Sequence, residues 1–416
     1  PQTNSTVLIQ GERILDIGPA EKVNIPPNAT RINVEGKTIL PGFIDLHVHL
    51  TFPPTVPVYV SDSESKANDR YFVNAESITK EPPLNPLANS VVKVDDLTSP
   101  NKSMAAMVKI RQWSAVSKPR TESLSALRAL HFMDINRNAG ITTLRDVGSS
   151  AEASQDLMSA RNLGYLDSVR FYSTGPVITV GGGIMPTEFQ ASYATGPYGF
   201  IEAVRKNYAS GFRHIKFYPP FSKEEIEAAI EEAKILKMRV TTHSGVAYDT
   251  DYTRIAIEAG TQSIEHASFP MADKPDNLLK LMAKRGVQLV PTISALTHHA
   301  TGQLKTYYET AGWTAENLDN IFRQAHQREI VMGIGTDAIF TQLDRTTPSF
   351  YFEEMKYFLE LGMTPLEVIT AATKNGAIIL GKEKDLGTLE KGKLADLQVI
   401  SGNPLENFDV LGKPEM

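Results

Sequence analysis

From residue 38 onward, the sequence alternates two kinds of segment, and this alternation limits the possible folds more than any other feature. Short runs rich in β-branched and aromatic residues, bounded by Gly, Pro, Asp or Ser, are typical of strands. Longer segments with apolar residues every three or four positions are typical of helices. We expect eight strands, at residues 38–50, 142–148, 168–177, 214–218, 239–244, 263–268, 288–293 and 331–338.

Helical segments occupy most of the intervals between these strands. In the clearest one, Ser222 stands three residues before Glu225, which is the spacing of a capping box at the start of a helix. Further helices are expected at residues 122–139, 151–163, 276–285, 315–327 and 350–361. Eight strand–helix units predict an α/β fold, a (β/α)8 TIM barrel. A doubly wound sheet is the alternative topology, but the sequence has no Gly-rich nucleotide-binding turn to favour it.

Two regions interrupt this pattern. Residues 51–120 form a long insertion with eight prolines and no strong periodicity. Such a segment is typical of a lid or an oligomerisation arm, and a disordered excursion is the alternative. Residues 1–40 and 376–416 contain strand and turn patterns at opposite ends of the chain. We therefore expect a barrel over residues 41–375 and one small β-sandwich domain formed by the N-terminal and C-terminal segments, in a homo-oligomer.

Composition narrows the chemistry and the partners. The 416 residues include no cysteine, which excludes disulfides, thiolate nucleophiles, cysteine-ligated zinc and iron–sulfur clusters. A net charge of −6 without a basic stripe argues against a nucleic-acid partner. No apolar run approaches the ~18 residues that a membrane span needs. We therefore expect a small-molecule substrate.

The sequence leaves the compartment open. It opens on Pro1, and no charged segment followed by an apolar one stands near this end, so no signal peptide is expected among the given residues. We expect a cytoplasmic protein, or a periplasmic or secreted one if a signal peptide was removed upstream of Pro1.

The pair His47 and His49, at the end of the first expected strand, is the first candidate for a metal site. Residues i and i+2 of a strand point to the same side, so the two imidazoles project together. Barrel active sites are built at the carboxyl ends of the strands. Four further metal-compatible residues lie near the ends of later strands, namely Lys216, His243, His266 and Asp337.

Lys216 differs from the other five candidates because it is the one basic amine among them. A charged amine buried among histidines would be costly in free energy. A neutral amine could instead react with CO₂ to give a carbamate, which is a carboxylate able to bridge two cations. Lys216 is therefore a candidate bridging ligand.

Taken together, these motifs resemble the metal-dependent amidohydrolase superfamily over nearly the whole chain outside residues 51–120. The resemblance rests on Leu40-Pro-Gly-Phe-Ile-Asp-Leu-His-Val-His, Gly140-Ile-Thr-Thr-Leu-Arg-Asp-Val-Gly, Ile264-Glu-His, Gly335-Thr-Asp-Ala and Lys391-Gly-Lys-Leu-Ala-Asp-Leu. It is closest to the branch that contains prolidase-type and arginine-carboxypeptidase-like enzymes, imidazolonepropionase and ochratoxin-hydrolysing amidases. In that branch the strand-four lysine, when present, is carboxylated and bridges two metals, usually zinc.

The resemblance implies a role for each candidate. His47, His49 and Asp337 would hold one divalent ion, His243 and His266 a second, and carboxylated Lys216 would join them. A metal-bridging hydroxide would attack the substrate carbonyl, with Asp337 as general base and then general acid.

The loops add three expected substrate contacts. Gly183 stands where prolidase-like relatives carry the histidine of a Gly-Gly-His sequence, which is a departure from simple prolidase chemistry. Tyr248 follows the fifth strand, as a nearby tyrosine does in the relatives. His298 follows the seventh strand and faces either the pocket or solvent.

Four residues near the ligands are candidates for supporting roles. Metal-bound imidazoles usually donate their other ring N–H to an acceptor, and Glu265 and Asp45 are candidates for this role. Glu265 is equally compatible with a purely structural role. Arg145 and Asp146 are expected to form a structural pair on the second strand.

We expect a hydrolase of amide C–N bonds in N-acyl amino acids, dipeptides or related small amides. The same site could act on carbamates, urea-type compounds, esters or lactones, because each has a carbonyl open to the same attack. A mononuclear deaminase or cyclic-amide hydrolase is a second class, but those relatives usually carry histidine in place of Lys216. A third class is an inactive structural homologue, and such proteins lose ligands that are all present here.

Overall fold

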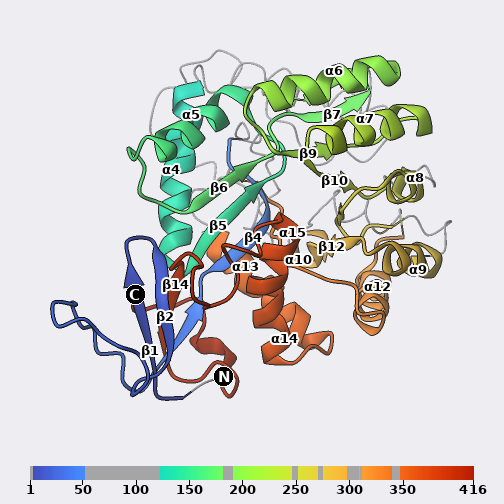
Figure 1. Cartoon of the computed structure of the whole chain (residues 1–416). Coiled ribbons are helices and arrows are strands. Elements are labelled where there is room, and N and C mark those ends of the chain that lie inside the picture. Colours follow the sequence, from blue (N-terminus) through green and yellow to red (C-terminus); the bar gives the residue numbers. More distant parts are fainter. Residues whose placement is uncertain are drawn as a thin grey trace, which may run out of the picture.

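The computed structural model of the chain describes residues 3–51, 122–180, 191–245, 252–269, 275–297, 309, 312–339 and 347–416. Within these residues the protein is α/β with parallel strands, which confirms the expected class (Figure 1). None of the described helices is long and apolar enough to cross a membrane. Nearly all of the insertion at 51–120 lies outside the described residues, as do Gly183, Tyr248 and His298.

Parallel strands form the centre of the fold. They are β4 (Phe43–His49), β5 (Ile141–Asp146), β6 (Arg170–Ser173), β7 (Val177–Val180), β8 (Ala191–Ala194), β9 (His214–Phe217), β10 (Arg239–His243), β11 (Ser263–Glu265), β12 (Gln288–Val290) and β13 (Ala338–Ile339). One sheet has the order β12–β11–β10–β9–β7–β8 and the other has the order β13–β4–β5–β6. Every residue of β4 and β9 is buried, as in strands covered on both faces.

The two sheets approach each other at two places. The strand expected at 168–177 is split into β6 and β7, which belong to different sheets and are joined by residues 174–176. On the other side, residues 331–337 lie between β12 and β4, since Leu289 N donates to Val331 O (3.0 Å) and Leu46 N donates to Ile334 O (2.9 Å). The strand expected there is reduced to a bridge at Met332 and the short β13.

Helices connect the strands and lie around the outside of the sheets in Figure 1. They are α4 (Glu122–Asn138), α5 (Ala151–Asn162), α6 (Gly196–Ala209), α7 (Lys223–Ile235), α8 (Tyr252–Ala259), α9 (Pro275–Arg285), α10 (Ile293–Thr297), α12 (Ala315–Gln327), α13 (Thr347–Glu360), α14 (Pro365–Thr370), the π-helical η5 (Ala371–Asn375), α15 (Gly376–Leu380) and the 3₁₀ turn η6 (Phe408–Val410). The expected capping box of α7 is present. Ser222 Oγ accepts from Glu225 N (3.2 Å), and the Glu225 carboxylate accepts from Ser222 N (2.7 Å).

The two ends of the chain lie side by side (Figure 1). Strands β1 (Ser5–Gln10) and β2 (Arg13–Pro19) form a hairpin, and β3 (Lys37–Pro41) pairs antiparallel with β14 (Leu397–Ser401). The hairpin also contacts the C-terminal segment, because Ile14 N donates to Lys393 O (2.8 Å).

The boundary between the terminal strands and the central sheets falls at Gly42. The strand expected at 38–50 is therefore divided: β3 joins the terminal pair, whereas β4 joins the central sheet. A Cβ at Gly42 would overlap the side chain of Thr142. Close by, the Arg170 guanidinium on β6 donates to both carboxylate oxygens of Asp396 (2.5 and 3.0 Å), which fastens the C-terminal segment to the central sheet.

Tyr351 on α13 connects the helical layer to β4. Its buried hydroxyl donates to Ile44 O (3.1 Å) and approaches Ala372 O (3.3 Å).

We expect Tyr351→Phe to lower the free energy of unfolding by about 1 kcal/mol, because the buried Ile44 carbonyl loses its side-chain donor. Chemical denaturation measures this loss. The matched control is Tyr165→Phe, whose ring is 82% exposed and should change stability by less than about 0.5 kcal/mol. Equal effects in the two variants would contradict the assignment.

Candidate metal centre

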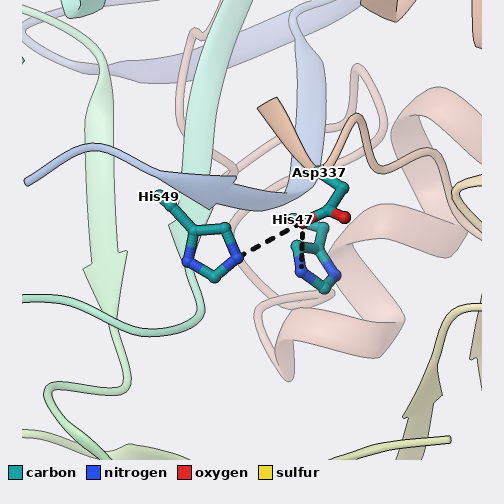
Figure 2. A group of neighbouring side chains, drawn as sticks. All are labelled: His47, His49 and Asp337. Carbon is teal, nitrogen blue, oxygen red and sulfur yellow. Dashed lines mark ion pairs between the residues drawn. The ribbon is translucent and has the colours of Figure 1, made fainter. Parts of the chain in front are cut away.

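His47, His49 and Asp337 meet at the carboxyl end of β4. Asp337 lies directly before β13, and its backbone N–H donates to His47 O (2.8 Å), which fixes the two segments together. Figure 2 shows both imidazoles turned toward the Asp337 carboxylate. Asp337 Oδ1 lies 3.2 Å from His47 Nε2 and 3.3 Å from His49 Nε2. One ligand atom from each of the three residues lies within 4.8 Å of the others, which is a spacing that a single ion could satisfy.

The other three candidates lie against this group. Lys216 Nζ is 3.3 Å from His47 Nε2. The ring centroids of His266 and His47 are 4.6 Å apart, and those of His266 and His243 are 4.4 Å apart. The structure thus brings together all six residues that the sequence nominated as metal ligands, at the ends of β4, β9, β10 and β11 and before β13.

Three of the four imidazoles have a partner for Nδ1. His47 Nδ1 donates to the Glu265 carboxylate (2.7 Å), His49 Nδ1 to Gly148 O (3.1 Å), and His266 Nδ1 lies 2.7 Å from Thr292 Oγ1. With a proton on Nδ1, His47 and His49 each keep the lone pair of Nε2, which lies next to Asp337, for a metal ion. His266 Nδ1 also lies 4.0 Å from Asp337 Oδ2. His243 Nδ1 differs, because it is buried and has no hydrogen-bond partner among the described residues.

Burial sets the protonation of these groups. It lowers the pKa values of His243 and His266 well below the ordinary value for histidine, so both rings are neutral near pH 7. Burial also lowers the pKa of Lys216 to about 8, which makes the neutral amine accessible. For Asp337, burial favours the protonated acid, but its interactions with His47, His266 and His49 hold its pKa well below the usual range.

This donor set fits a divalent metal. Neutral imidazoles and a carboxylate are the ligands that zinc-like ions prefer when cysteine is absent. The unpartnered Nδ1 of His243 supports the same interpretation, because buried polar atoms in proteins are normally satisfied. The residues present therefore fit a metal centre.

Glu265 is placed at the base of this centre. Its fully buried carboxylate accepts from His47 Nδ1, from Arg145 (2.5 Å) and from the hydroxyl of Thr241. Glu265 therefore orients a candidate ligand, which decides between its two expected roles. The expected pairing of Arg145 with Asp146 is wrong, because the Arg145 guanidinium reaches across to β11 and binds Glu265 instead.

Asp45 and Asp146 hold backbone segments around the centre. Asp45 accepts from His47 N (3.1 Å) and from the hydroxyl of Thr336 (2.8 Å), and so supports the segment that carries Asp337. Asp146 accepts from Leu50 N (2.8 Å), immediately after β4. Asp45 therefore binds a backbone N–H group and a hydroxyl, and not an imidazole as expected.

Sequence reasoning missed two residues next to the centre. Thr292 was placed inside an expected strand, and no motif marked it as a partner of His266. Tyr218 follows β9, and its ring lies 4.2 Å from that of His243, centroid to centroid. A signal for Tyr218 existed in the sequence, since it stands two residues after Lys216 and alternation in a strand places both on one side.

Comparison with known proteins agrees with this geometry. The profile of the amidohydrolase family matches residues 38–416. The chain belongs to the amidohydrolase family. The membership confirms the expectation drawn from the motifs around His47, Glu265 and Asp337.

Individual amidohydrolases resemble the chain to different extents. Ochratoxinase from Aspergillus niger is 30% identical over 205 residues, which cover 48% of this chain but only 40% of ochratoxinase. Imidazolonepropionase from Fusobacterium nucleatum is 23% identical over 98% of this chain and 87% of its own length. The crystal structure of a Xaa-Pro dipeptidase with bound methionine superposes with a TM-score of 0.71 at 25% identity, covering 99% of this chain and 92% of the other. These relatives confirm the expected prolidase and imidazolonepropionase-like branch.

A side chain at Gly335 would disturb the packing around His47. A Cβ there would overlap the Val290 side chain and lie 2.8 Å from His47 Cβ. We expect Gly335→Ala to displace His47 and to reduce zinc affinity at least tenfold, as loss of ligand support typically does. Zinc retained after equilibrium dialysis measures the effect. The control is Gly199→Ala in α6, where the nearest atom to a new Cβ is 3.7 Å away. Unchanged zinc affinity in Gly335→Ala would show that the site tolerates displacement of His47.

Proposed function

We propose that the chain is a metal-dependent hydrolase of amide C–N bonds in N-acyl amino acids, dipeptides or related small amides. The observation that carries this proposal is the convergence of four imidazoles, one carboxylate and one lysine of lowered pKa at the ends of parallel strands. Membership of the amidohydrolase family supports the reaction class. The likeness to a Xaa-Pro dipeptidase and to imidazolonepropionase supports cleavage of C–N bonds in small molecules.

We assign the six ligands to two ions. His47, His49 and Asp337 would hold the first ion, because both imidazoles approach Asp337 Oδ1. His243 and His266 would hold the second, because their ring centroids are 4.4 Å apart. Lys216 would bridge the ions as a carbamate, formed when its neutral amine adds to CO₂ and releases one proton. Zinc suits these nitrogen and oxygen donors.

Asp337 carries the proton transfers in this proposal. When bound, two divalent ions lower the pKa of a shared water and polarise the substrate carbonyl. The Asp337 carboxylate is ionised near pH 7 and sits between the two ligand groups, so it can accept the proton of the attacking water. It then returns that proton to the leaving nitrogen, which departs as an amine. The imidazoles, each orientated through Nδ1 where a partner exists, stay in place throughout.

The proposal also covers the barrel and the small domain beside it. We propose that the two parallel sheets are the wall of a (β/α)8 barrel over residues 41–375, closed through β6–β7 and through residues 331–337. Residues 1–40 and 376–416 would form the small β-sandwich domain beside it. The insertion at 51–120 would serve as a lid or as an arm in a homo-oligomer.

Lys216→Ala tests the two-ion assignment. We expect the wild-type chain to bind two zinc ions, and the variant to lose metal and activity because the bridging ligand is gone. Acetate or propionate should restore part of both, since a small carboxylate can occupy the place of the carbamate. Elemental analysis and hydrolysis rates measure these changes. The control is Lys206→Ala on the exposed side of α6. A wild-type chain with one ion would favour a mononuclear deaminase or cyclic-amide hydrolase, and a chain with none an inactive homologue.

A substrate panel tests the bond that is cleaved. N-acyl amino acids and Xaa-Pro dipeptides should be hydrolysed with kcat/KM at least tenfold above matched carbamates, urea-type compounds, esters and lactones. The expectation follows from the C–N bond-cleaving relatives, whereas the loops determine which acyl group fits. Assaying product amine and acid with zinc-loaded protein measures this ranking. Faster hydrolysis of the carbamates or lactones would replace the amide assignment while leaving the metal centre intact.

A further inference from the structure

Thr292 adopts a backbone conformation that threonine rarely adopts. Its φ is +46°, in the left-handed region, where a β-branched residue is strained. The residue is fully buried and stands between the end of β12 and the start of α10. Such conformations persist where the surrounding structure enforces them, and they gather at functional sites.

Thr292 occupies the position that normally caps a helix. Its carbonyl accepts from Leu296 N (3.4 Å), so it is the residue that precedes the first turn of α10. A threonine in this position usually turns its hydroxyl to the free amides of that turn. Here Thr292 Oγ1 instead lies 2.7 Å from His266 Nδ1.

Glu354 on α13 takes the amides that Thr292 leaves free. Ile293 N donates to Glu354 Oε1 (2.9 Å) and Ser294 N donates to Glu354 Oε2 (2.7 Å). The carboxylate has no exposed surface, and burial raises its pKa to about 7. Burying a carboxylate costs free energy unless hydrogen bonds compensate for the lost water. The two hydrogen bonds to the start of α10 provide this compensation, so they account for the position of Glu354.

We propose that Glu354 is a positioning residue for His266: by capping α10 in place of Thr292, it frees the Thr292 hydroxyl to hold the His266 ring in its orientation beside Asp337. The two residues act in series, since Glu354 touches the backbone after Thr292 and Thr292 touches His266. The inference rests on the proposed function, because His266 matters here as a ligand of the second ion.

Three variants separate this role from general support of the fold. Thr292→Val removes the hydroxyl but keeps β-branching at the same backbone position, and Thr292→Ser keeps the hydroxyl. Glu354→Gln places an amide group against one of the two backbone N–H donors of α10. The matched control is Glu360→Gln, which removes an exposed carboxylate at the end of the same helix.

Zinc affinity is the first readout. We expect Thr292→Val to weaken the second zinc equivalent 10- to 100-fold, as loss of a ligand's hydrogen-bond partner typically does. Glu354→Gln should weaken it about tenfold or more, whereas Thr292→Ser and Glu360→Gln should stay within about twofold of wild type. The double variant of Thr292→Val and Glu354→Gln should equal Thr292→Val alone, because residues acting in series are not additive. Additive losses would overturn the proposal.

The ring of His266 is the second readout and needs no metal. In zinc-free protein with ¹⁵N-labelled histidine, the nitrogen shifts of His266, assigned by their loss in His266→Gln, report which nitrogen carries the proton. We expect Glu354→Gln and Thr292→Val to change the Nδ1 signal alike, with Thr292→Ser and Glu360→Gln unchanged. An unchanged signal in Glu354→Gln refutes the proposal even if zinc binding falls. Glu354→Asp, which keeps the charge, replaces Glu354→Gln if the latter unfolds.

This pair of readouts also separates the proposal from the function on which it rests. A wild-type chain that binds a single zinc contradicts the two-ion assignment. In that case the shared change in the His266 signal still supports the role of Glu354, and its absence still refutes it. Thermal unfolding of each zinc-free variant shows whether a change in affinity follows from lost stability.

Discussion

The centre of the structure depends on one fully buried ion pair, between Glu265 and Arg145. Neither group has water to stabilise its charge, so each must be bonded within the protein. Glu265 is satisfied by Arg145, His47 and Thr241, while Arg145 also donates to Leu46 O (2.6 Å). These contacts join β4, β5, β10 and β11 at one level. The same bonds that neutralise the pair therefore fix the strand that carries His47 and His49, so the stability of the sheet and the geometry of the centre have a common origin.

The sequence predicts that the six candidate ligands lie together, because their placement follows from simple rules of strand geometry. Alternation in a strand puts His47 and His49 on one side, and parallel strands bring Lys216, His243 and His266 to the same end. The α/β class follows from the repeated change between strand and helix patterns, and the start of α7 follows from Ser222 and Glu225. In each case the sequence pattern behind the prediction is a local one, and the packing of the fold agrees with it.

The remaining features depend on partners far apart in the sequence. Arg145 pairs with Glu265, 120 positions away, and a pattern around Arg145 points only to its neighbour Asp146. The division at Gly42 depends on how closely the side chain of Thr142 approaches. The φ of Thr292 and its support by Glu354 need two elements packed together before either residue has a role. The expected substrate contacts Gly183, Tyr248 and His298 lie outside the described residues and stay predictions.

The meeting of the two chain ends has a consequence for biosynthesis. Strand β3 is paired with β14, which comprises residues 397–401 of 416. On the ribosome, β3 emerges long before its partner. Since β3 leads into β4 through Gly42 alone, the pairing beside the strand that carries His47 and His49 stays incomplete until β14 has been translated. A chain that ended before β14 would contain all six candidate ligands. It would still lack the strand that pairs with β3 and so holds the start of β4, which carries His47 and His49.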